Sequence, residues 1–401
     1  MLPLEATMSD KKKAPSGSIN FSVGYRIGCG RRAKLAREAA SVKIKSALVV
    51  TDPGVAGLPW FQPMLEEAAA AGLELSVFSD VRGNPVLANV EAGVKQYRDN
   101  KHDGVILVGG GSPMDVGKAI ALWSGHEGHL FDYEFLDNKW RNIQPKKVPP
   151  MLAVPTTSGT GSEVSPGAVI SDKDAGIKRT LLHPVLTPKS VVADPELTFA
   201  LPRTLTATTG MDALTHCFEA YCARGYNPVA EGIALEGMRL INEHLAVCCR
   251  DPENAASRTQ MMMAAAMGAI AFQKGLGLVH AMTHPLGAVT DIHHGLGNAI
   301  LLPYIARYNR EAIEPKMDLL ARYLGLDAGG FDGVLKWLLD IRKELEIPHA
   351  LRGINGIDDV GLAAELAPKA LAETAYVMPN PRGADEAAIK ELYVQAIEGA
   401  L

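Results

Sequence analysis

The stretch Val105–Lys118, with the sequence VILVGGGSPMDVGK, decides the fold of the N-terminal half of this 401-residue chain. It opens with an apolar run typical of a buried strand, passes through the glycines Gly109–Gly111, and continues with helical spacing. Ser112 is a predicted N-cap, and Pro113 suits a first helical turn. Glycines let a bulky anion approach the backbone, and a helix N-terminus offers it N–H groups. The stretch therefore predicts a pyrophosphate cradle, with a plain tight turn as the alternative.

Similar apolar runs recur on both sides of this stretch. They predict strands at Lys45–Thr51, Leu73–Phe78, Gly104–Val108 and Met151–Val154, separated by helical spacing at Trp60–Ala71 and Val86–Arg98. This alternation predicts a Rossmann-like α/β domain over residues 19–198, with a parallel sheet covered by helices on both faces. The preceding residues 1–18 are predicted to be a disordered tail.

The strand signals stop after the dipeptide at 194–195. Long helical patterns follow at Gly210–Ala223, Pro228–Cys248, Ala255–Ala271, Asp332–Leu345 and Asp385–Ile397. The predicted fold class is therefore an α/β domain followed by an all-α domain over residues 199–401.

The composition is that of an ordinary globular protein, with 47% hydrophobic and 21% charged residues. The net charge of −5 leaves no basic surplus for binding nucleic acid. The longest nearly apolar run, Met261–Phe272, is shorter than the roughly 20 residues that span a bilayer. Five cysteines without a paired CxxC motif favour a reducing compartment. We expect a cytoplasmic protein with no nucleic-acid or membrane partner.

A second glycine pattern competes for the dinucleotide. The segment Gly28–Ala33 (GCGRRA) fits the G-x-G-x-x-A fingerprint, but Gly24 and Arg26 interrupt the apolar run that should precede it. Asp52 serves either glycine loop, because it ends an apolar strand from which a carboxylate accepts the ribose hydroxyls and repels a 2′-phosphate. The sequence therefore predicts NAD rather than NADP.

A third loop, Pro155–Glu163 (PTTSGTGSE), interleaves hydroxyls with glycines after another apolar run. Such a loop suits contacts with phosphate or nicotinamide, and it would equally suit an ordinary mobile loop.

Two pairs of polar residues mark the helical half. Asp212 and His216 lie on one helix face, as do His280 and His284, because residues four positions apart are about one turn apart. The pair His293–His294 follows in a short loop. One carboxylate with several imidazoles is a donor set suited to iron(II) or zinc(II). The spacing predicts a metal site from these six candidates but does not choose among them.

Taken together, these segments resemble the iron-containing (group III) alcohol dehydrogenases. The resemblance extends over Asp52, Asn84-Pro85, GGGSPMDVGK (109–118), PTTSGTGSEV (155–164), DPELT (194–198), GMDALTHCFEAY (210–221), GLVHAMTHPLGA (277–288), HHGLGNAILLP (293–303) and NPRG (380–383). It implies a dinucleotide-binding α/β domain joined to a helical metal-binding domain. This architecture is similar to that of dehydroquinate-synthase-like proteins, with the active site in the cleft between the domains.

The resemblance also implies roles for single residues. The metal ligands would be Asp212, His216, His280 and His294. His284 would lie near the nicotinamide in a proton-relay or positioning role, and His293, where the family commonly has proline, is the alternative to His294. Cofactor contacts would come from Asp52, Asn84, Gly110, Gly111, Ser112, Thr156, Thr157, Thr160, Lys178 and Leu197.

The activity implied by the resemblance is hydride transfer between NAD(H) and a small primary alcohol or aldehyde. A divalent metal, iron(II) or alternatively zinc(II), would act as a Lewis acid on the substrate oxygen. A homodimer or higher homo-oligomer is also implied.

Two other functions stay open at this point. A glycerol-dehydrogenase-like or dehydroquinate-synthase-like enzyme would act on a polyol or sugar acid. A lyase for a phosphorylated acid should carry clustered cations near the metal motifs, whereas the basic residues between 205 and 300 lie outside them: Arg224, Arg239, Arg250, Arg258 and Lys274. The non-enzymatic alternative is a metal- and dinucleotide-binding sensor or assembly protein.

Overall fold

A parallel sheet forms the centre of the N-terminal half in the computed structural model, which describes residues 23–173, 175 and 177–401. The predicted tail 1–18 lies outside these residues. The sheet contains β1 (Gly24–Ile27), β2 (Ser46–Val50), β3 (Glu74–Phe78), β4 (Gly104–Gly109), β5 (Met151–Pro155) and β8 (Ser190–Ala193). Their order is β1-β8-β5-β4-β2-β3, and all neighbours are parallel. The four predicted strands are confirmed. The expectation that Gly24 and Arg26 would interrupt a strand is wrong, because β1 forms there as an edge strand.

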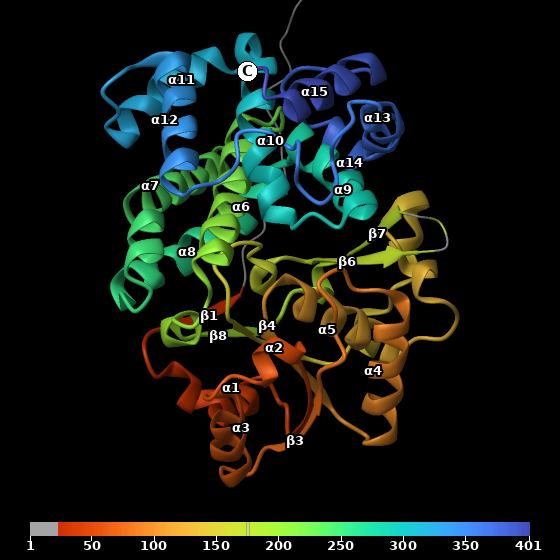
Figure 1. Ribbon diagram of the computed structural model, residues 1–401. Coiled ribbons are helices and arrows are strands. Elements are labelled where there is room, and N and C mark those ends of the chain that lie inside the picture. Colours follow the sequence, from red (N-terminus) through yellow and green to blue (C-terminus); the bar gives the residue numbers. More distant parts are fainter. Residues whose placement is uncertain (1–22, 174, 176) are drawn as a thin grey trace, which may run out of the picture.

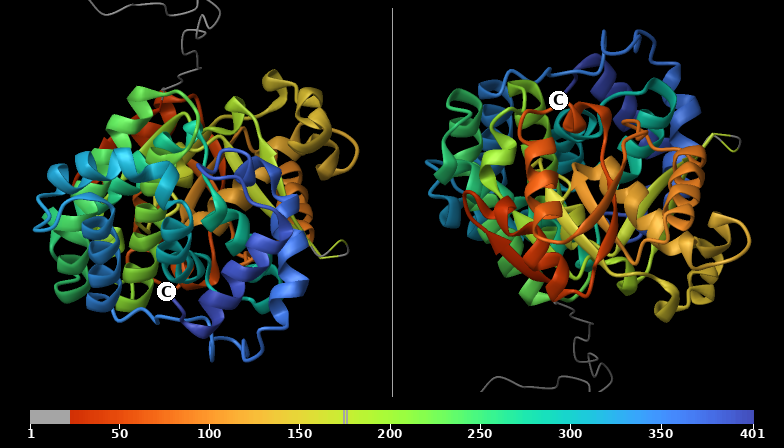
Figure 2. Two further views of the ribbon diagram at one scale, coloured as in Figure 1. Left: turned by 90° about the horizontal axis from the view of Figure 1, so that it is seen from above. Right: turned by 90° about the horizontal axis from the view of Figure 1, so that it is seen from below.

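Helices cover both faces of this sheet, as predicted (Figure 1). On β2, the alternate residues Ala47 and Val49 pack in one apolar cluster with α1 (Leu35–Ser41) and α3 (Phe61–Ala70). Leu48 and Val50 point the other way, into a cluster with α4 (Leu87–Asp99) and α5 (Gly111–Ser124). Because successive side chains of a strand point to opposite faces, and helices cover both faces, all of these residues are buried. The two helical layers are visible from below in Figure 2.

An antiparallel hairpin, β6 (Gly167–Asp172) and β7 (Ile177–Leu182), was not predicted. Its second strand is mostly half-exposed and carries Lys178 and Arg179, so its sequence lacks the apolar run of a core strand. The hairpin lies where the α/β half meets the helical half, and β7 packs against α9 (Figure 1).

The C-terminal half is helical throughout its regular elements. It contains α6 (Arg203–Cys222), α7 (Pro228–Arg250), α8 (Ala255–Ala271), α9 (Leu278–Thr290), α10 (His294–Tyr308), α11 (Arg310–Leu324), α12 (Gly330–Glu344), α13 (Leu362–Ala372), α14 (Thr374–Val377) and α15 (Glu386–Glu398). The five predicted helices are confirmed. Four further helices, α9, α10, α11 and α13, each contain an internal proline, and proline usually signals a helix end.

Short elements complete the chain between these helices and strands. They are α2 (Pro53–Ala56) and the 3-10 turns η1 (Arg31–Lys34), η2 (Leu130–Tyr133), η3 (Leu136–Asn142), η4 (Pro145–Lys147), η5 (Ser162–Val164), η6 (Pro184–Leu186), η7 (Pro195–Thr198) and η8 (Phe272–Lys274). The last sheet strand ends at Ala193 and α6 begins at Arg203. The division between domains at residue 198 remains a prediction.

In the described part of the chain, no single helix has both the length and the apolar character needed to cross a bilayer. Residues Ala255–Lys274 and Leu278–Thr290 meet that criterion only as a pair, which bends by 108° between its two members.

Candidate functional site

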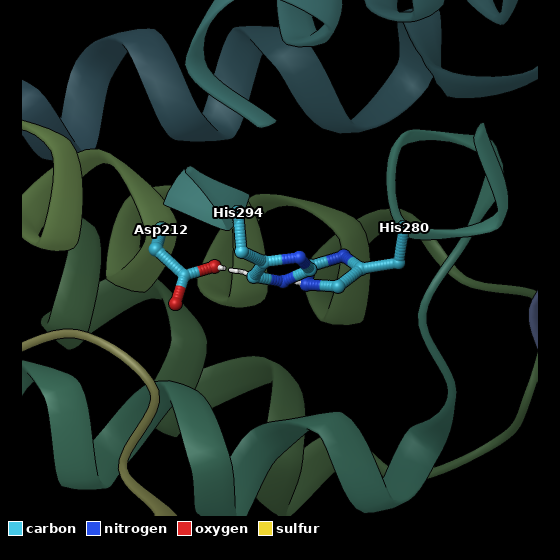
Figure 3. Close-up of side chains that lie close together, drawn as sticks. All are labelled: Asp212, His280 and His294. Carbon is cyan, nitrogen blue, oxygen red and sulfur yellow. Dashed lines mark ion pairs between the residues drawn. The ribbon is translucent and has the colours of Figure 1, made fainter. Parts of the chain in front are cut away.

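The four predicted metal ligands come from three helices, and three of them, Asp212, His280 and His294, form the mutually close donor group found among the described residues. Asp212 and His216 lie on α6, His280 on α9, and His294 at the start of α10. Oδ1 of Asp212 lies 3.8 Å from Nε2 of His216, 3.8 Å from Nε2 of His280 and 3.6 Å from Nε2 of His294. Two donors bound at about 2.1 Å to one tetrahedral ion lie about 3.4 Å apart, so these spacings fit a divalent metal. Figure 3 shows Asp212, His280 and His294 facing one another.

A glycine allows α10 to approach α6 closely enough for this convergence. A Cβ on Gly295 would lie 2.2 Å from the carbonyl oxygen of Thr208 and 3.3 Å from Cβ of Asp212. Any side chain at this position would push the start of α10, and with it His294, away from Asp212. The glycine after the last predicted ligand is therefore part of the site's geometry.

Burial sets the protonation of the clustered histidines. It lowers the pKa of His216 to about 4. Burial, followed by the neighbouring His280 and His284, also lowers the pKa of His294 well below its ordinary value. Both imidazoles are therefore neutral at physiological pH, which is the form that binds a metal.

The other two histidine candidates lie beside this cluster rather than in it. His284 is one turn beyond His280 on α9, which runs through Pro285 without ending. Its Nδ1 lies 3.5 Å from Oε2 of Glu373, and burial lowers its pKa. His293 is exposed and precedes the first residue of α10, and no ion pair joins it to Asp212, whereas His216 and His294 each lie within 3.8 Å of that carboxylate in the described part of the chain.

Two polar residues around the cluster were missed by the sequence analysis. Glu219 on α6 contacts Nδ1 of His280 at 2.6 Å. Asn298 on α10 is fully buried, and its Nδ2 donates to Oδ1 of Asp212 at 2.8 Å. Both could have been found by the helical spacing already used, because Glu219 is three residues after His216 and Asn298 is four residues after His294.

The glycine stretch after β4 and the hydroxyl-rich loop after β5 form one surface. A Cβ on Gly110 would lie 3.1 Å from Cγ2 of Thr157, and one on Gly111 would lie 3.0 Å from Oγ1 of Thr160. The N–H of Thr156 donates to the carbonyl of Gly109 at 3.0 Å. Two motifs about 50 residues apart thus meet at the N-terminus of α5, where a helix binds anions best.

The predicted N-cap of α5 is wrong by two residues. Gly110 occupies that position, and α5 begins at Gly111 with no side-chain cap. Ser112 lies inside the first turn, where its Oγ donates to the carbonyl of Gly83 at 2.8 Å. A glycine N-cap leaves the first N–H groups of the helix without a capping side chain, which suits an external anion.

Asp52 lies at the point where the strand order reverses. The chain leaves β2 for β3 on one side and returns to β4 on the other, and ligands of such sheets bind at the carboxyl ends of the strands that flank this reversal. Oδ1 of Asp52 accepts from the N–H of Val55 at 2.9 Å and caps α2. Its Oδ2 would lie 3.5 Å from a Cβ on Gly109, so the carboxylate borders the glycine cradle.

The competing glycine pattern already holds an internal carboxylate. Asp194 accepts from the N–H of Gly30 at 3.2 Å and from the N–H of Arg32 at 3.1 Å. The guanidinium of Arg32 adds a third bond to Asp194 at 2.9 Å. The N–H groups that this loop would offer to a pyrophosphate are thus used within the chain, and the geometry favours the Gly109–Gly111 loop.

The remaining predicted cofactor residues occupy different surroundings. The Nδ2 of Asn84 donates to Oδ1 of Asp291 at the end of α9, so it bridges the two halves of the chain. Lys178 on β7 faces α9, with its Nζ 3.7 Å from the position of a Cβ on Gly287. Leu197 is 2% exposed, and its side chain packs in the apolar cluster that contains α1 and α3.

A buried acid next to the hydroxyl-rich loop gives a prediction for stability against pH. Burial raises the pKa of Glu163 from 4.5 to about 7. Between these values the unfolded chain has lost a proton that the folded protein keeps, so the free energy of unfolding should fall as pH rises through this window. Glu163→Gln retains an acceptor for the Tyr25 hydroxyl and should flatten this slope, with a gain of at most about 3 kcal/mol at pH 7. Urea unfolding at pH 5 and pH 7.5 tests this, and equal slopes for both proteins would contradict it.

Two family models together match most of the chain. The description "iron-containing alcohol dehydrogenase" matches residues 23–195, and the C-terminal description of the Fe-containing alcohol dehydrogenase family matches residues 206–397. The chain belongs to this family. The predicted fold class and the predicted alcohol dehydrogenase activity are confirmed, and the non-enzymatic alternative is set aside.

Named relatives of this alcohol dehydrogenase cover nearly its whole length. It is 39% identical to a 4-hydroxybutyrate dehydrogenase of Cupriavidus necator over 85% of this chain and 90% of that protein. A solved 1,3-propanediol oxidoreductase superposes with a TM-score of 0.89 at 32% identity, covering 95% of this chain and 100% of the other. The sulfoacetaldehyde reductase of Bifidobacterium kashiwanohense, solved with NAD+, gives a TM-score of 0.86 at 26% identity, covering 96% and 99% of the two chains.

Proposed function

We propose that this protein transfers hydride between NAD(H) and a small primary alcohol or aldehyde at a divalent metal, iron(II) or alternatively zinc(II). The observation that carries the proposal is the loop after β5, which reaches both parts of the site. Its Thr157 and Thr160 pack on the glycine cradle, while Gly159 lies so close to α6 that a Cβ there would be 2.7 Å from Cβ of Thr209, three residues before Asp212. A dinucleotide in the cradle would therefore have the metal ligands as close neighbours.

Under this proposal the predicted site residues bind three groups: the metal, the pyrophosphate and the adenosine ribose. Asp212, His216, His280 and His294 would hold the metal, which when bound supplies a Lewis acid for the substrate oxygen. The N-terminus of α5 would hold the pyrophosphate together with Gly110, Gly111, Ser112, Thr156, Thr157 and Thr160, while Asp52 would bind the adenosine ribose. Asn84, Lys178 and Leu197 stay predicted cofactor contacts.

His284 is the proposed proton carrier. Its ring lies 5.5 Å from that of His294, beside the metal ligands, and its Nδ1 faces Glu373. The Glu373 side chain is 24% exposed, so a proton held by His284 has a route toward solvent. Burial lowers the pKa of His284 and so keeps the ring neutral, with a nitrogen free to accept a proton, while Glu373 opposes that shift and would stabilise the protonated ring.

The relatives support the cofactor and the substrate class. The printed names of two of them concern 4-hydroxybutyrate and 1,3-propanediol, both of which carry a primary alcohol. The sulfoacetaldehyde reductase was solved with NAD+. We therefore propose a small primary alcohol or aldehyde here, with a polyol or sugar acid as the second candidate.

The test is NADH consumption by anaerobically purified protein against short aldehydes, semialdehydes and a polyol-derived ketone. We expect turnover with the short aldehydes, its loss on exhaustive chelation, and its return on adding Fe(II) or Zn(II). Full activity after complete metal removal would contradict the proposal.

The adenosine end of the cofactor site gives a separate prediction. Asp52→Gly should relax the preference for NADH over NADPH, because it removes the carboxylate that repels a 2′-phosphate. It also removes the N-cap of α2, worth about 1 kcal/mol, whereas Asp52→Asn keeps the cap. Comparing kcat/KM for the two cofactors in both variants separates charge from stability. An unchanged cofactor ratio would show that Asp52 is not the ribose acid.

We further propose a cytoplasmic homodimer. The five cysteines are all free, and four of them are buried, which suits a reducing compartment. The homodimer rests on the family resemblance, and light scattering on the purified protein tests it.

A further inference from the structure

Glu219 is a buried carboxylate whose two oxygens both serve α9. It lies on α6 two turns after Asp212 and is 5% exposed. Its Oε2 contacts Nδ1 of His280 at 2.6 Å, and its Oε1 accepts from the N–H of Val279 at 2.7 Å. Among the described residues, no lysine or arginine forms an ion pair with it. A buried carboxylate is costly unless it is hydrogen-bonded, so these two contacts account for its presence.

The contact with His280 fixes which ring nitrogen is available. A neutral imidazole carries one N–H, and donating it from Nδ1 to Glu219 leaves the lone pair on Nε2. It is Nε2 of His280 that lies 3.8 Å from Oδ1 of Asp212, in the cluster of predicted ligands. Of those histidines, His280 is the one that meets a carboxylate through Nδ1 in the described part of the chain.

The surrounding packing holds Glu219 and the start of α9 together. A Cβ on Gly277 would lie 2.8 Å from Oε1 of Glu219 and 2.8 Å from Oδ1 of Asn380. Asn380, from the NPRG segment, accepts from the N–H of Leu278 at 3.2 Å. The N-terminus of α9 is thus held by two side-chain acceptors, and a negative charge is favourable at this end of a helix.

We propose that Glu219 is a positioning residue that fixes the tautomer and the orientation of His280 for metal binding. This inference rests on the proposed metal-dependent function. Glu219 itself lies outside the group of converging donors, so it acts through His280. Partners of this kind typically change metal affinity by about 10–100-fold when they are replaced.

The experiment measures metal affinity in Glu219→Gln, whose side chain has the same size. Glutamine offers one acceptor oxygen, so it satisfies only one of the two N–H donors of α9 and turns its own NH2 toward the other. Competition of Co(II) or Zn(II) with a chromophoric chelator should show about 10–100-fold weaker binding, and the visible spectrum of bound Co(II) should shift. Binding and spectrum equal to those of the unchanged protein would overturn the proposal.

Two further variants separate positioning from folding. Glu231→Gln makes the same change on α7, where the carboxylate bonds to Lys274 and Lys316 outside the site, and it should leave metal affinity unchanged. If Glu219→Gln does not fold, Glu219→Asp keeps the charge but falls short of His280, and it should weaken metal binding in the same direction. Wild-type affinity in a folded Glu219→Asp would then overturn the proposal. Failure of the unchanged protein to bind metal would instead contradict the proposed function.

Discussion

Replacing His280 with alanine is expected to abolish metal binding and to lower kcat/KM by at least about 1,000-fold. The reason lies in the geometry of the cluster. His280 supplies the Nε2 from α9, so its removal leaves donors from α6 and α10 alone. It also leaves Glu219 as a buried carboxylate without its imidazole partner, which is costly for a charged group. Metal analysis after dialysis and the NADH assay give the two readouts.

A matched control is His244→Ala. His244 lies on α7 in the same helical half, and its Nδ1 contacts the hydroxyl of Ser257 rather than the cluster. Its loss should leave metal content and kcat/KM near those of the unchanged protein. If His280→Ala retained stoichiometric metal and full turnover, the assignment of His280 as a ligand would be wrong.

Four of the six sheet strands could be predicted from the sequence because each shows an apolar run, whereas β8 was missed although it is buried, because it is only four residues long. Strands β2 and β4 are buried on both faces, so each appears as a continuous apolar run. Strand β1 was missed because it is an edge strand with half-exposed residues, and β7 was missed because it is mostly half-exposed and contains Lys178 and Arg179. The spacing of His280 and His284 indicated a helical turn in α9, but the full lengths of α9 and α10 were not predicted because each contains an internal proline.

Only those parts of the site that lie on one helix could be predicted from spacing in the sequence. Spacing paired Asp212 with His216 and His280 with His284, but pairs on separate helices have no local signal that sets their distance. The family resemblance implies four ligands; the structure places Asp212, His280 and His294 mutually close and His216 3.8 Å from Asp212, and the ligand set itself stays a prediction. Glu219 and Asn298 were missed because their partners, His280 and Asp212, lie on other helices, and nothing in the sequence near an acid or amide indicates such a contact. The Ser112 cap was misplaced because glycine at the N-cap suits an external anion better than a side chain does.

Lys118 carries the second large expected effect, this time on stability. It is fully buried in α5, and its three N–H groups face four oxygens of the segment after β5 that lie within hydrogen-bond distance of Nζ: the carbonyls of Ser162, Ser165 and Gly167 and the hydroxyl of Ser162. Burial lowers its pKa to about 8, against the opposing effect of Asp115 and Glu163, so the ammonium form still predominates at neutral pH.

Lys118→Met should lower the free energy of unfolding by about 3–5 kcal/mol, because three carbonyls lose a charged hydrogen-bond donor and each buried group left unsatisfied costs about 1–3 kcal/mol. Methionine fills a similar volume but leaves the three carbonyls without their donor, whereas Asp115 keeps its hydrogen bonds from Ser162 and Val169. Lys95→Met is the matched control, because Lys95 pairs only with Asp99 on the exposed face of α4, and it should change stability by no more than about 0.5 kcal/mol. Urea unfolding at pH 7 compares the two variants, and equal midpoints would contradict a structural role for Lys118.

The same change should reach the cofactor, because Lys118 fixes the segment that follows Thr157 and Thr160. Those threonines pack on Gly110 and Gly111, so a loosened segment should weaken NADH binding even in protein that remains folded. NADH fluorescence titration of folded Lys118→Met measures this effect separately from unfolding. Loss of stability with unchanged NADH affinity would show that Lys118 stabilises the fold without affecting the cradle. In that case only the glycines at the start of the GGGSPMDVGK stretch would contribute to cofactor binding.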